Sequence, residues 1–230
     1  MEILSVEIKG LDASDGMLKI AKNRVPSPLT LSFDNIDDKA RGIPESSAAS
    51  LAITTSFERY DLEQPIETQS SIHSAHAVVC SLVIEHLQSL DAFFEHLIQA
   101  RLIRPQGFLL LTNMHPDMAQ GAQPRLTTPQ KAGANGHLVT GAGFIDAATG
   151  DKIRAEGDFA HTIPEVVAAA SAHGFQLIGN DEMEEMKVEP WMLDKGLVDA
   201  ERGRKWAESG VMCWFGGVFR YIEREKNERL

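Results

Sequence analysis

Apolar and polar positions alternate along this chain with two different periods, and the change of period predicts strands and helices in turn. Residues 3–11 (ILSVEIKGL) are rich in aliphatic and β-branched side chains and run into an aspartate, which is typical of a buried parallel strand entering a turn. Residues 14–24 (SDGMLKIAKNR) have helical spacing, with Ser14 as N-cap and basic residues at the end. The first 24 residues therefore predict a strand, a turn and a helix.

The same alternation returns further along the chain. FERYD (57–61) predicts a short strand that ends at Asp61, and SAHAVVCSLVIEHL (74–87) predicts an apolar strand that runs into polar residues. SLDAFFEHLIQARLI (89–103) predicts a helix capped by its first residue, and RPQGFLLLTNMHP (104–116) predicts a turn followed by another buried strand. Strands and helices in this order are typical of a parallel sheet covered on both faces.

The hydrophobic pattern loses its regular period after residue 116. DMAQGAQPRLTTPQKAGANG (117–136) lacks periodicity and predicts a loop or lid, and DAATGD (146–151) between two short β-rich segments predicts a hairpin. A helix is predicted from Thr162, its N-cap, to Gly174, its stop. The last predicted elements are a strand, a mostly helical excursion and a final strand, at residues 175–186, 187–209 and 211–225. The two strands are expected to form an antiparallel edge pair.

Residues 25–56 interrupt the alternation. They hold three prolines, paired aspartates and the small-residue run ESSAASLAITTS. We expect a long, partly mobile connection here, since loops of this length are usually functional or poorly ordered. Non-native sequence from a faulty gene model stays an alternative.

Composition narrows the classes of partner and site. The chain has 230 residues with 22 basic against 33 acidic side chains, a net charge of −11, which argues against nucleic-acid or anionic-membrane partners. Cys80 and Cys213 lie in apolar runs without Cys or His at ligand spacing, so buried thiols and no metal site are expected. No signal peptide is evident and no apolar run approaches the ~20 residues of a membrane span, so we expect a cytoplasmic protein.

Three stretches carry a resemblance to a known family, the class I S-adenosylmethionine-dependent methyltransferases. GLDASDGMLKIAKNR (10–24) resembles their second-strand motif, YDLEQPI (60–66) the loop after their third strand, and residues 76–116 their fourth strand, helix and fifth strand. Residues 3–117 are covered well, and 162–223 more weakly. Gln106 replaces the first glycine of the family's turn before the fifth strand, although a single glycine can still make this turn.

The resemblance implies an α/β fold. It is a Rossmann-like, doubly wound and mostly parallel sheet with an antiparallel edge strand, incomplete at its N-terminus. One domain is expected, made of a cofactor-side core, a lid and hairpin insertion, and a C-terminal helix with edge strands, at residues 3–117, 118–160 and 161–230.

The implied cofactor is S-adenosyl-L-methionine. A carboxylate at a strand end, such as Asp12, can accept two hydrogen bonds from ribose hydroxyls, and Met17 is placed to lie against an adenine face. By resemblance, Asp61 and Leu62 contact the adenine amino group. The alternatives are a simple helix-turn acid at Asp12 and core packing at Met17. The full set of implied cofactor residues is Asp12, Ala13, Met17, Asp61, Leu62, Cys80, Ser81 and Leu82, of which the last three flank the methionine portion.

Methyl transfer asks mainly for positioning, and a base is needed only when the acceptor must lose a proton. His86 and His115 are the candidate catalytic residues, with His161 as a further histidine able to act at neutral pH. The alternatives are hydrogen bonding at a helix start for His86 and loop packing for His115. The three tryptophans either line an apolar acceptor pocket or pack in the core.

One part of the expected cofactor site is missing from the sequence. No segment has the D-x-G-x-G-x-G form, and the G-x-G at Gly141 and Gly143 lacks the third glycine and a helix start. The missing first strand would leave two ladders of backbone groups unpaired. A truncated product or gene model, one segment of a split enzyme, and a relative that has lost catalysis remain open, and we favour truncation.

Two functions from different classes follow. The first is methyl transfer from S-adenosylmethionine to a small-molecule acceptor, for which the acidic charge and the Pro/Gly-rich lid argue. The second is a non-catalytic methyltransferase-like subunit that covers its open sheet in a homo- or hetero-oligomer. A nicotinamide-dependent oxidoreductase would need a complete G-x-G-x-x-G, which the sequence does not contain.

Overall fold

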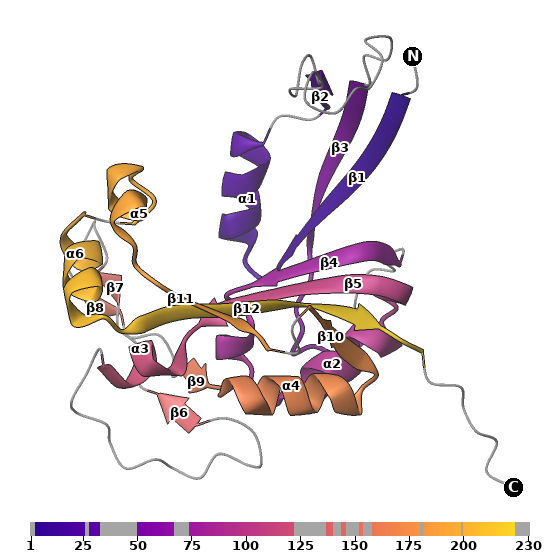
Figure 1. Ribbon diagram of the computed structural model, residues 1–230. Helices are drawn as coiled ribbons and strands as arrows, with labels where there is room; N and C mark the ends of the chain where they lie inside the picture. The colour runs from indigo at the N-terminus through magenta and orange to yellow at the C-terminus, as the bar shows by residue number, and fades with distance from the viewer. Residues whose placement is uncertain are drawn as a thin grey trace, which may run out of the picture. The chain divides into compact units, whose positions relative to one another are not determined.

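The protein forms two compact units, residues Met1–Ser70 and Ser71–Leu230, which are described one at a time. The structure is a computed structural model that describes residues 3–25, 28–32, 50–66, 74–121, 137–139, 144–145, 152–153, 158–179, 182–198 and 200–223 (Figure 1). The expectation that residues 1–230 make a single methyltransferase-like domain stays a prediction.

The first unit is a three-stranded sheet with one helix. Its elements are β1 (Ile3–Asp12), α1 (Asp15–Arg24), β2 (Leu29–Ser32) and β3 (Ser50–Arg59). The strand order is β1-β3-β2, with β1 and β3 parallel and β2 antiparallel to β3. Ser14 caps α1 as predicted, because its side chain accepts a hydrogen bond from the Met17 amide at 3.3 Å.

Two expectations for this unit were wrong. Residues 25–56 were expected to be irregular, yet in the described part of this stretch β2 and the first seven residues of β3 are regular strands, and β3 ends at Arg59 instead of Asp61. Residues 26–27 and 33–49 lie outside the described residues. The β-branched residues of SLAITTS outweighed the loop-like small residues around them. The strand over residues 3–11 was expected to be buried, but Val6 and Ile8 are 42% and 48% exposed. Among the described residues β1 pairs with β3 alone, so one edge of the strand carries no neighbour there.

The second unit is built on a five-stranded sheet. Its strands are β4 (Ala75–Ser81), β5 (Ile103–Met114), β10 (Phe175–Ile178), β11 (Glu184–Lys187) and β12 (Met212–Tyr221). The order is β10-β12-β5-β4. The strand β10 pairs with the last residues of β12, and β11 pairs with the first residues of β12. The strands β4 and β5 are parallel, whereas β12 runs antiparallel to β5, β10 and β11. The predicted α/β sheet with an antiparallel pair near one edge is confirmed, with β12 one place inside the edge.

Helices and short strands complete this unit. They are the 3-10 turn η3 (Ile84–His86), α2 (Leu90–Gln99), α3 (Pro116–Gly121), α4 (Ile163–Ala172), α5 (Pro190–Asp194) and α6 (Ala200–Ser209), with the strand pairs β6 (His137–Val139) with β9 (Asp158–Ala160) and β7 (Phe144–Ile145) with β8 (Lys152–Ile153). The pairing of β7 with β8 confirms the hairpin predicted around DAATGD. The predicted lid begins as α3, and its residues 122–136 lie outside the described residues.

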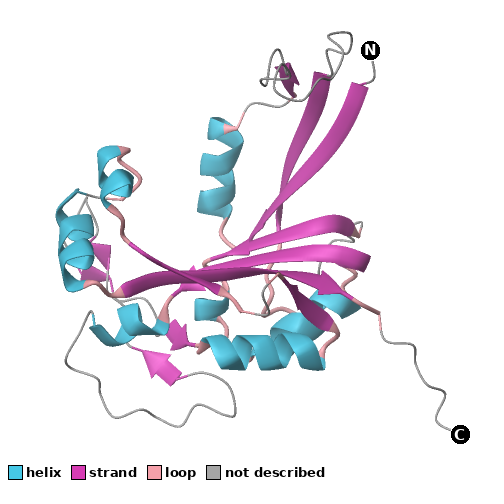
Figure 2. Cartoon of the chain, in the orientation of Figure 1, coloured by secondary structure: helices cyan, strands magenta, loops and turns pink. Residues whose placement is uncertain are grey.

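A packed core fixes the sheet of the second unit. Figure 2 shows α2 and α4 together on one face of the sheet. Phe94 from α2 packs against Phe175 of β10 with ring centroids 5.2 Å apart, and Leu109 and Leu111 of β5 are fully buried. Each such side chain contributes about 1.5–3 kcal/mol when buried. This core holds the carboxyl ends of β4 and β5 in fixed register.

Candidate cofactor and acceptor site

The carboxyl end of β1 is held against the end of β3 by backbone contacts. The amide of Tyr60 donates to the Asp12 carbonyl at 3.0 Å, and Arg59 Nε donates to the Ala13 carbonyl at 3.3 Å. The half-buried side chain of Asp12 accepts the Ser14 amide through Oδ1 at 2.7 Å. Its other oxygen has no hydrogen-bond donor among the described residues, which leaves a carboxylate oxygen at the strand end for a ligand.

Asp61 makes a matching turn at the end of β3. Its Oδ1 accepts the Glu63 amide at 3.0 Å, just as Asp12 accepts the amide two residues on. Because β1 and β3 are parallel and Asp12 lies in register with Arg59, the two acids follow neighbouring strand ends. Leu62, next to Asp61, is half-buried. The first unit therefore brings together two of the predicted carboxylates at one edge of its sheet.

Met17 lies on the open side of α1. It is 54% exposed, whereas its neighbour Leu18 is 5% exposed and forms the buried contact of the helix. The alternative of core packing for Met17 is therefore wrong. An exposed thioether one turn after a strand end is free to pack on an apolar ligand face.

The carboxyl end of β4 carries the second set of predicted residues. Ser81 is exposed and its Oγ accepts a hydrogen bond from Thr112 Oγ1 at 3.0 Å. Leu82 has a φ of 55°, and its amide donates a hydrogen bond to the Thr112 carbonyl at 2.9 Å. Such a conformation costs about 1–3 kcal/mol in a residue other than glycine and is concentrated at ligand sites.

Cys80 differs from its two neighbours. Its side chain is 7% exposed, as predicted for a structural thiol, and burial raises its pKa to about 12. Its thiol is therefore inert at neutral pH, and at this position a ligand can meet backbone groups rather than the sulfur.

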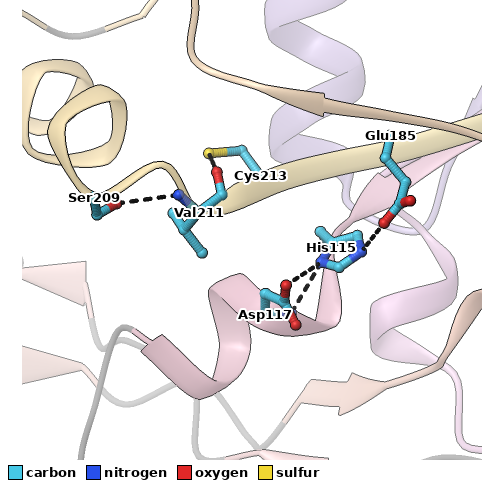
Figure 3. A network of polar contacts seen from close by, with 6 residues as sticks. All are labelled: His115, Asp117, Glu185, Ser209, Val211 and Cys213. Atoms are coloured by element: carbon cyan, nitrogen blue, oxygen red, sulfur yellow. Dashed lines mark hydrogen bonds and ion pairs between the residues drawn. The ribbon is translucent and has the colours of Figure 1, made fainter.

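His115 lies just after the carboxyl end of β5, in the close-up of Figure 3. Its Nδ1 accepts the Asp117 amide at 3.1 Å and its Nε2 lies 2.7 Å from Glu185 Oε1. An amide can only donate, so we assign the proton of the neutral ring to Nε2, which donates to Glu185. The ring is buried and packs in a T-shaped arrangement with Phe215, with centroids 6.2 Å apart.

The backbone around His115 is tied to β12 and to the turn before it. The His115 amide donates to the Cys213 carbonyl at 2.9 Å, and the Cys213 thiol points to the Val211 carbonyl at 3.5 Å. The Val211 amide in turn contacts Ser209 Oγ at 3.4 Å (Figure 3). The position of His115 is thus fixed by the chain around it.

The two other histidines lie in contrasting surroundings. The side chain of His86 is 61% exposed, and its Nε2 is 3.7 Å from Glu85 Oε1. His161 is 1% exposed and donates through Nε2 to the Leu87 carbonyl at 2.7 Å. Burial lowers its pKa, and its role is to hold the turn η3. Of the three histidines, His86 alone has an exposed ring.

The tryptophans divide between core and surface. Trp206 and Trp214 pack edge to face, with centroids 6.3 Å apart, around the buried Val188 and Cys213. Trp191 is 54% exposed. Core packing therefore accounts for two of the three.

Two polar groups of the site were missed by sequence reasoning. Glu185 and Thr112 contact predicted residues, but they come from segments distant from them in the sequence: Glu185 lies 70 positions from His115. Glu185 belongs to the run EMEEM, whose acidic residues resemble any solvated edge strand. Within the described residues no three His, Cys, Asp or Glu side chains are grouped as metal ligands.

Open α/β sheets form a class that takes its ligands at the carboxyl ends of parallel strands, which is where the predicted residues of each unit lie. Comparison with known proteins makes this class more specific. The chain is 32% identical over 216 residues to an uncharacterized methyltransferase of Emericella nidulans, an alignment that covers 91% of this chain and 61% of that protein. The chain thus spans about three fifths of this relative. No protein-family model matches.

Solved structures give the same answer for the fold. A proposed S-adenosylmethionine-dependent methyltransferase from Listeria monocytogenes superposes with a TM-score of 0.56 at 14% identity, covering 96% of this chain and 90% of the other. One from Methanosarcina mazei gives 0.52 at 12% identity, covering 96% and 92%. The chain shares the fold of these S-adenosylmethionine-dependent methyltransferases, and the fold that the resemblance predicted from the sequence is confirmed. No helix in the described ranges is long and apolar enough to cross a membrane.

Proposed function

We propose that this protein binds S-adenosylmethionine and transfers its methyl group to a small-molecule acceptor. The observation that carries the proposal is the pair of carboxylates, Asp12 and Asp61, at the ends of two neighbouring parallel strands. A carboxylate oxygen at a strand end suits vicinal ribose hydroxyls, and the exposed Met17 suits the adenine face. The relative named as a methyltransferase supports methyl transfer, and the solved structure that shares the fold is named as dependent on S-adenosylmethionine.

The second unit carries predicted cofactor residues of its own. The exposed Ser81 and the strained Leu82 are proposed to bind the methionine portion through their backbone and hydroxyl groups. When bound, the cofactor supplies an electrophilic methyl carbon on a sulfonium. The residues of the chain then need to hold the acceptor in line with that carbon, and such positioning can supply about 7–11 kcal/mol of the barrier.

A small acceptor is favoured by charge. The chain carries a net charge of −11, and the segment 182–189 next to the end of β5 holds four glutamates and one lysine. A phosphate backbone would be repelled by such a surface. An uncharged or cationic small molecule would not be.

The cofactor proposal is tested by isothermal calorimetry of the 230-residue chain with S-adenosylmethionine and S-adenosylhomocysteine. Asp12→Asn is expected to weaken binding at least about tenfold, because hydrogen bonds to charged groups are worth about 1.5–3 kcal/mol. Asp15→Asn is the matched control, since it removes the same charge from an exposed position three residues away. Absence of binding to the unaltered chain, or equal binding by both variants, would contradict the proposal.

A further inference from the structure

A histidine and a carboxylate from distant parts of the second unit form a short polar pair just beyond the end of β5. Nε2 of His115 and Oε1 of Glu185 are 2.7 Å apart (Figure 3). Glu185 comes from β11 and His115 from the junction of β5 and α3, and the buried Phe215 of β12 packs against the imidazole in a T-shaped arrangement. The pair is therefore preformed on a rigid sheet.

The two members of the pair differ in access to solvent. The side chain of His115 is 8% exposed, whereas that of Glu185 is 45% exposed. Both ring nitrogens of His115 are already engaged, by the Asp117 amide and by Glu185. A ligand outside the protein can thus reach the carboxylate but not the ring.

The direction of the hydrogen bond gives each residue a role. Because the Asp117 amide occupies Nδ1, the ring presents Nε2–H to Glu185 and holds one of its oxygens. The other oxygen, Oε2, then remains for a donor on a ligand. This is the arrangement in which a carboxylate accepts a proton at a fixed position, oriented by a histidine.

We propose that Glu185 accepts the proton that an O–H or N–H acceptor loses on methylation, and that His115 positions its carboxylate. This inference rests on the proposed function. The acceptor's lone pair forms the bond to the methyl carbon, the carbon–sulfur bond breaks with its electron pair staying on sulfur, and the acceptor's proton passes to Glu185 Oε2. From there the proton is released to solvent, because the side chain is partly exposed.

The same geometry selects the class of acceptor. The charged groups facing His115 are Glu185 from β11 and Asp117 from α3, whose Oδ2 lies 3.5 Å from Nδ1, while β12 presents the apolar Phe215. Both charges are negative, so a carboxylate or phosphate acceptor would be repelled. Phenols, alcohols and amines are neutral or cationic hydrogen-bond donors and fit the site.

A direct binding experiment tests the pair without requiring turnover. In the chain labelled with nitrogen-15 histidine, the probes are phenol, aniline and benzoate, three molecules of similar size. Phenol and aniline are expected to shift the His115 Nε2 signal in the unaltered chain and in Glu184→Gln, but not in Glu185→Gln. Glu184 is the matched control because it is exposed and its side chain points to the opposite face of β11. An equal shift by benzoate, or no shift by phenol and aniline, would overturn the proposal.

Kinetics gives the second test. With labelled S-adenosylmethionine and an accepting phenol or amine, Glu185→Gln is expected to lower kcat about 10²-fold or more with a much smaller change in KM, whereas Glu184→Gln stays at the unaltered rate. His115→Gln, which retains an N–H donor, should keep most of the activity that His115→Ala loses.

The two proposals fail in different ways. If the cofactor does not bind in the calorimeter, the proposed function fails, and the nitrogen-15 experiment still decides whether Glu185 binds neutral donors. If the cofactor binds and methyl transfer occurs with Glu185→Gln equal to Glu184→Gln, the assignment of Glu185 alone is overturned.

Discussion

Three residues other than glycine adopt a left-handed backbone conformation in the described part of the chain. Among the described residues other than glycine, Leu82, Arg101 and Gln106 have positive φ angles of 55°, 55° and 64°. The segment RPQG was predicted as a turn before the strand, but it lies inside β5, where the pairing with β4 shifts register. The left-handed conformation falls on Gln106 and not on Gly107. Gly107 is needed for a different reason, because a Cβ there would meet the Arg104 carbonyl at 2.8 Å. Gln106 therefore takes the left-handed conformation, and Gly107 leaves the space that a side chain would occupy.

Substitutions in this segment should therefore act in opposite directions. Gln106→Gly is expected to raise the free energy of unfolding by about 1 kcal/mol. It removes left-handed strain of about 1–2 kcal/mol, and the greater entropy of the unfolded chain with glycine offsets part of this gain. Gly107→Ala is expected to lower it by about 1–3 kcal/mol through overpacking. Urea unfolding of both variants measures the difference. A less stable Gln106→Gly variant would show that the segment is not strained there.

The buried His161 makes stability depend on pH. Burial lowers its pKa below the ordinary value of 6.5, so between these values the unfolded chain binds more protons than the folded one. Stability is therefore full above about pH 6.5 and is lost as the pH falls below it. His96, whose pKa burial also lowers, acts in the same direction.

This dependence can be measured by urea unfolding at pH 7.5 and at pH 5.5. His161→Asn should lower stability at pH 7.5 and flatten its decline toward pH 5.5. His86→Asn, at an exposed histidine, should leave the decline unchanged. A decline of the same size in all three proteins would mean that other groups cause it.

At the scale of elements, helix ends are where local sequence acts most directly. Thr162 and Glu165 form a complete capping box at the start of α4, with the Thr162 amide 2.8 Å from Glu165 Oε2. Thr162→Ala is expected to cost about 1 kcal/mol of stability. Glu208→Ala, at an exposed position of α6, serves as the control and should cost less than about 0.5 kcal/mol. Thermal or urea unfolding compares the two, and equal losses would contradict a role for the cap.

The elements that sequence predicted are those with local causes. Periodicity and caps located α1, α2 and α4, because the cap and the apolar stripe lie within one segment. The strand β2 and the first seven residues of β3 were missed, since prolines and small residues hide a pairing that forms with distant residues. The division of residues 175–186 into β10 and β11 depends on β12, more than 25 positions away.

The candidate site follows the same rule. Strand-end residues such as Asp12, Ser81 and His115 can be located from sequence, because a strand and its end are local features. The contact between Glu185 and His115 cannot, because it is made by the pairing of β11 with β12 and of β12 with β5. The buried state of the His115 ring has the same origin, so sequence indicated the position but not its accessible partner.

For the whole molecule, the uneven distribution of the core has a measurable effect. In the first unit the buried side chains of the hydrophobic core among the described residues are Leu18 and Tyr60, whereas the second unit buries a far larger set. Local stability follows buried apolar contacts. Amides of β1 and β3 should therefore exchange with deuterium faster than those of β5 and β12. Hydrogen exchange with mass spectrometry tests this, and equal protection of the four strands would contradict it.

Because both cysteines of the second unit are buried, the rate at which each thiol reacts depends on local opening of its strand. With a pKa of about 12, Cys80 has only about one thiolate in 10⁴ at pH 8, and its side chain in β4 is closed to reagents. Cys213 in β12 is fully buried as well. Alkylation of either sulfur must wait until its strand opens. The rates at which iodoacetamide alkylates Cys80 and Cys213 would therefore measure how often β4, at the end of the strand order, and β12, inside it, open.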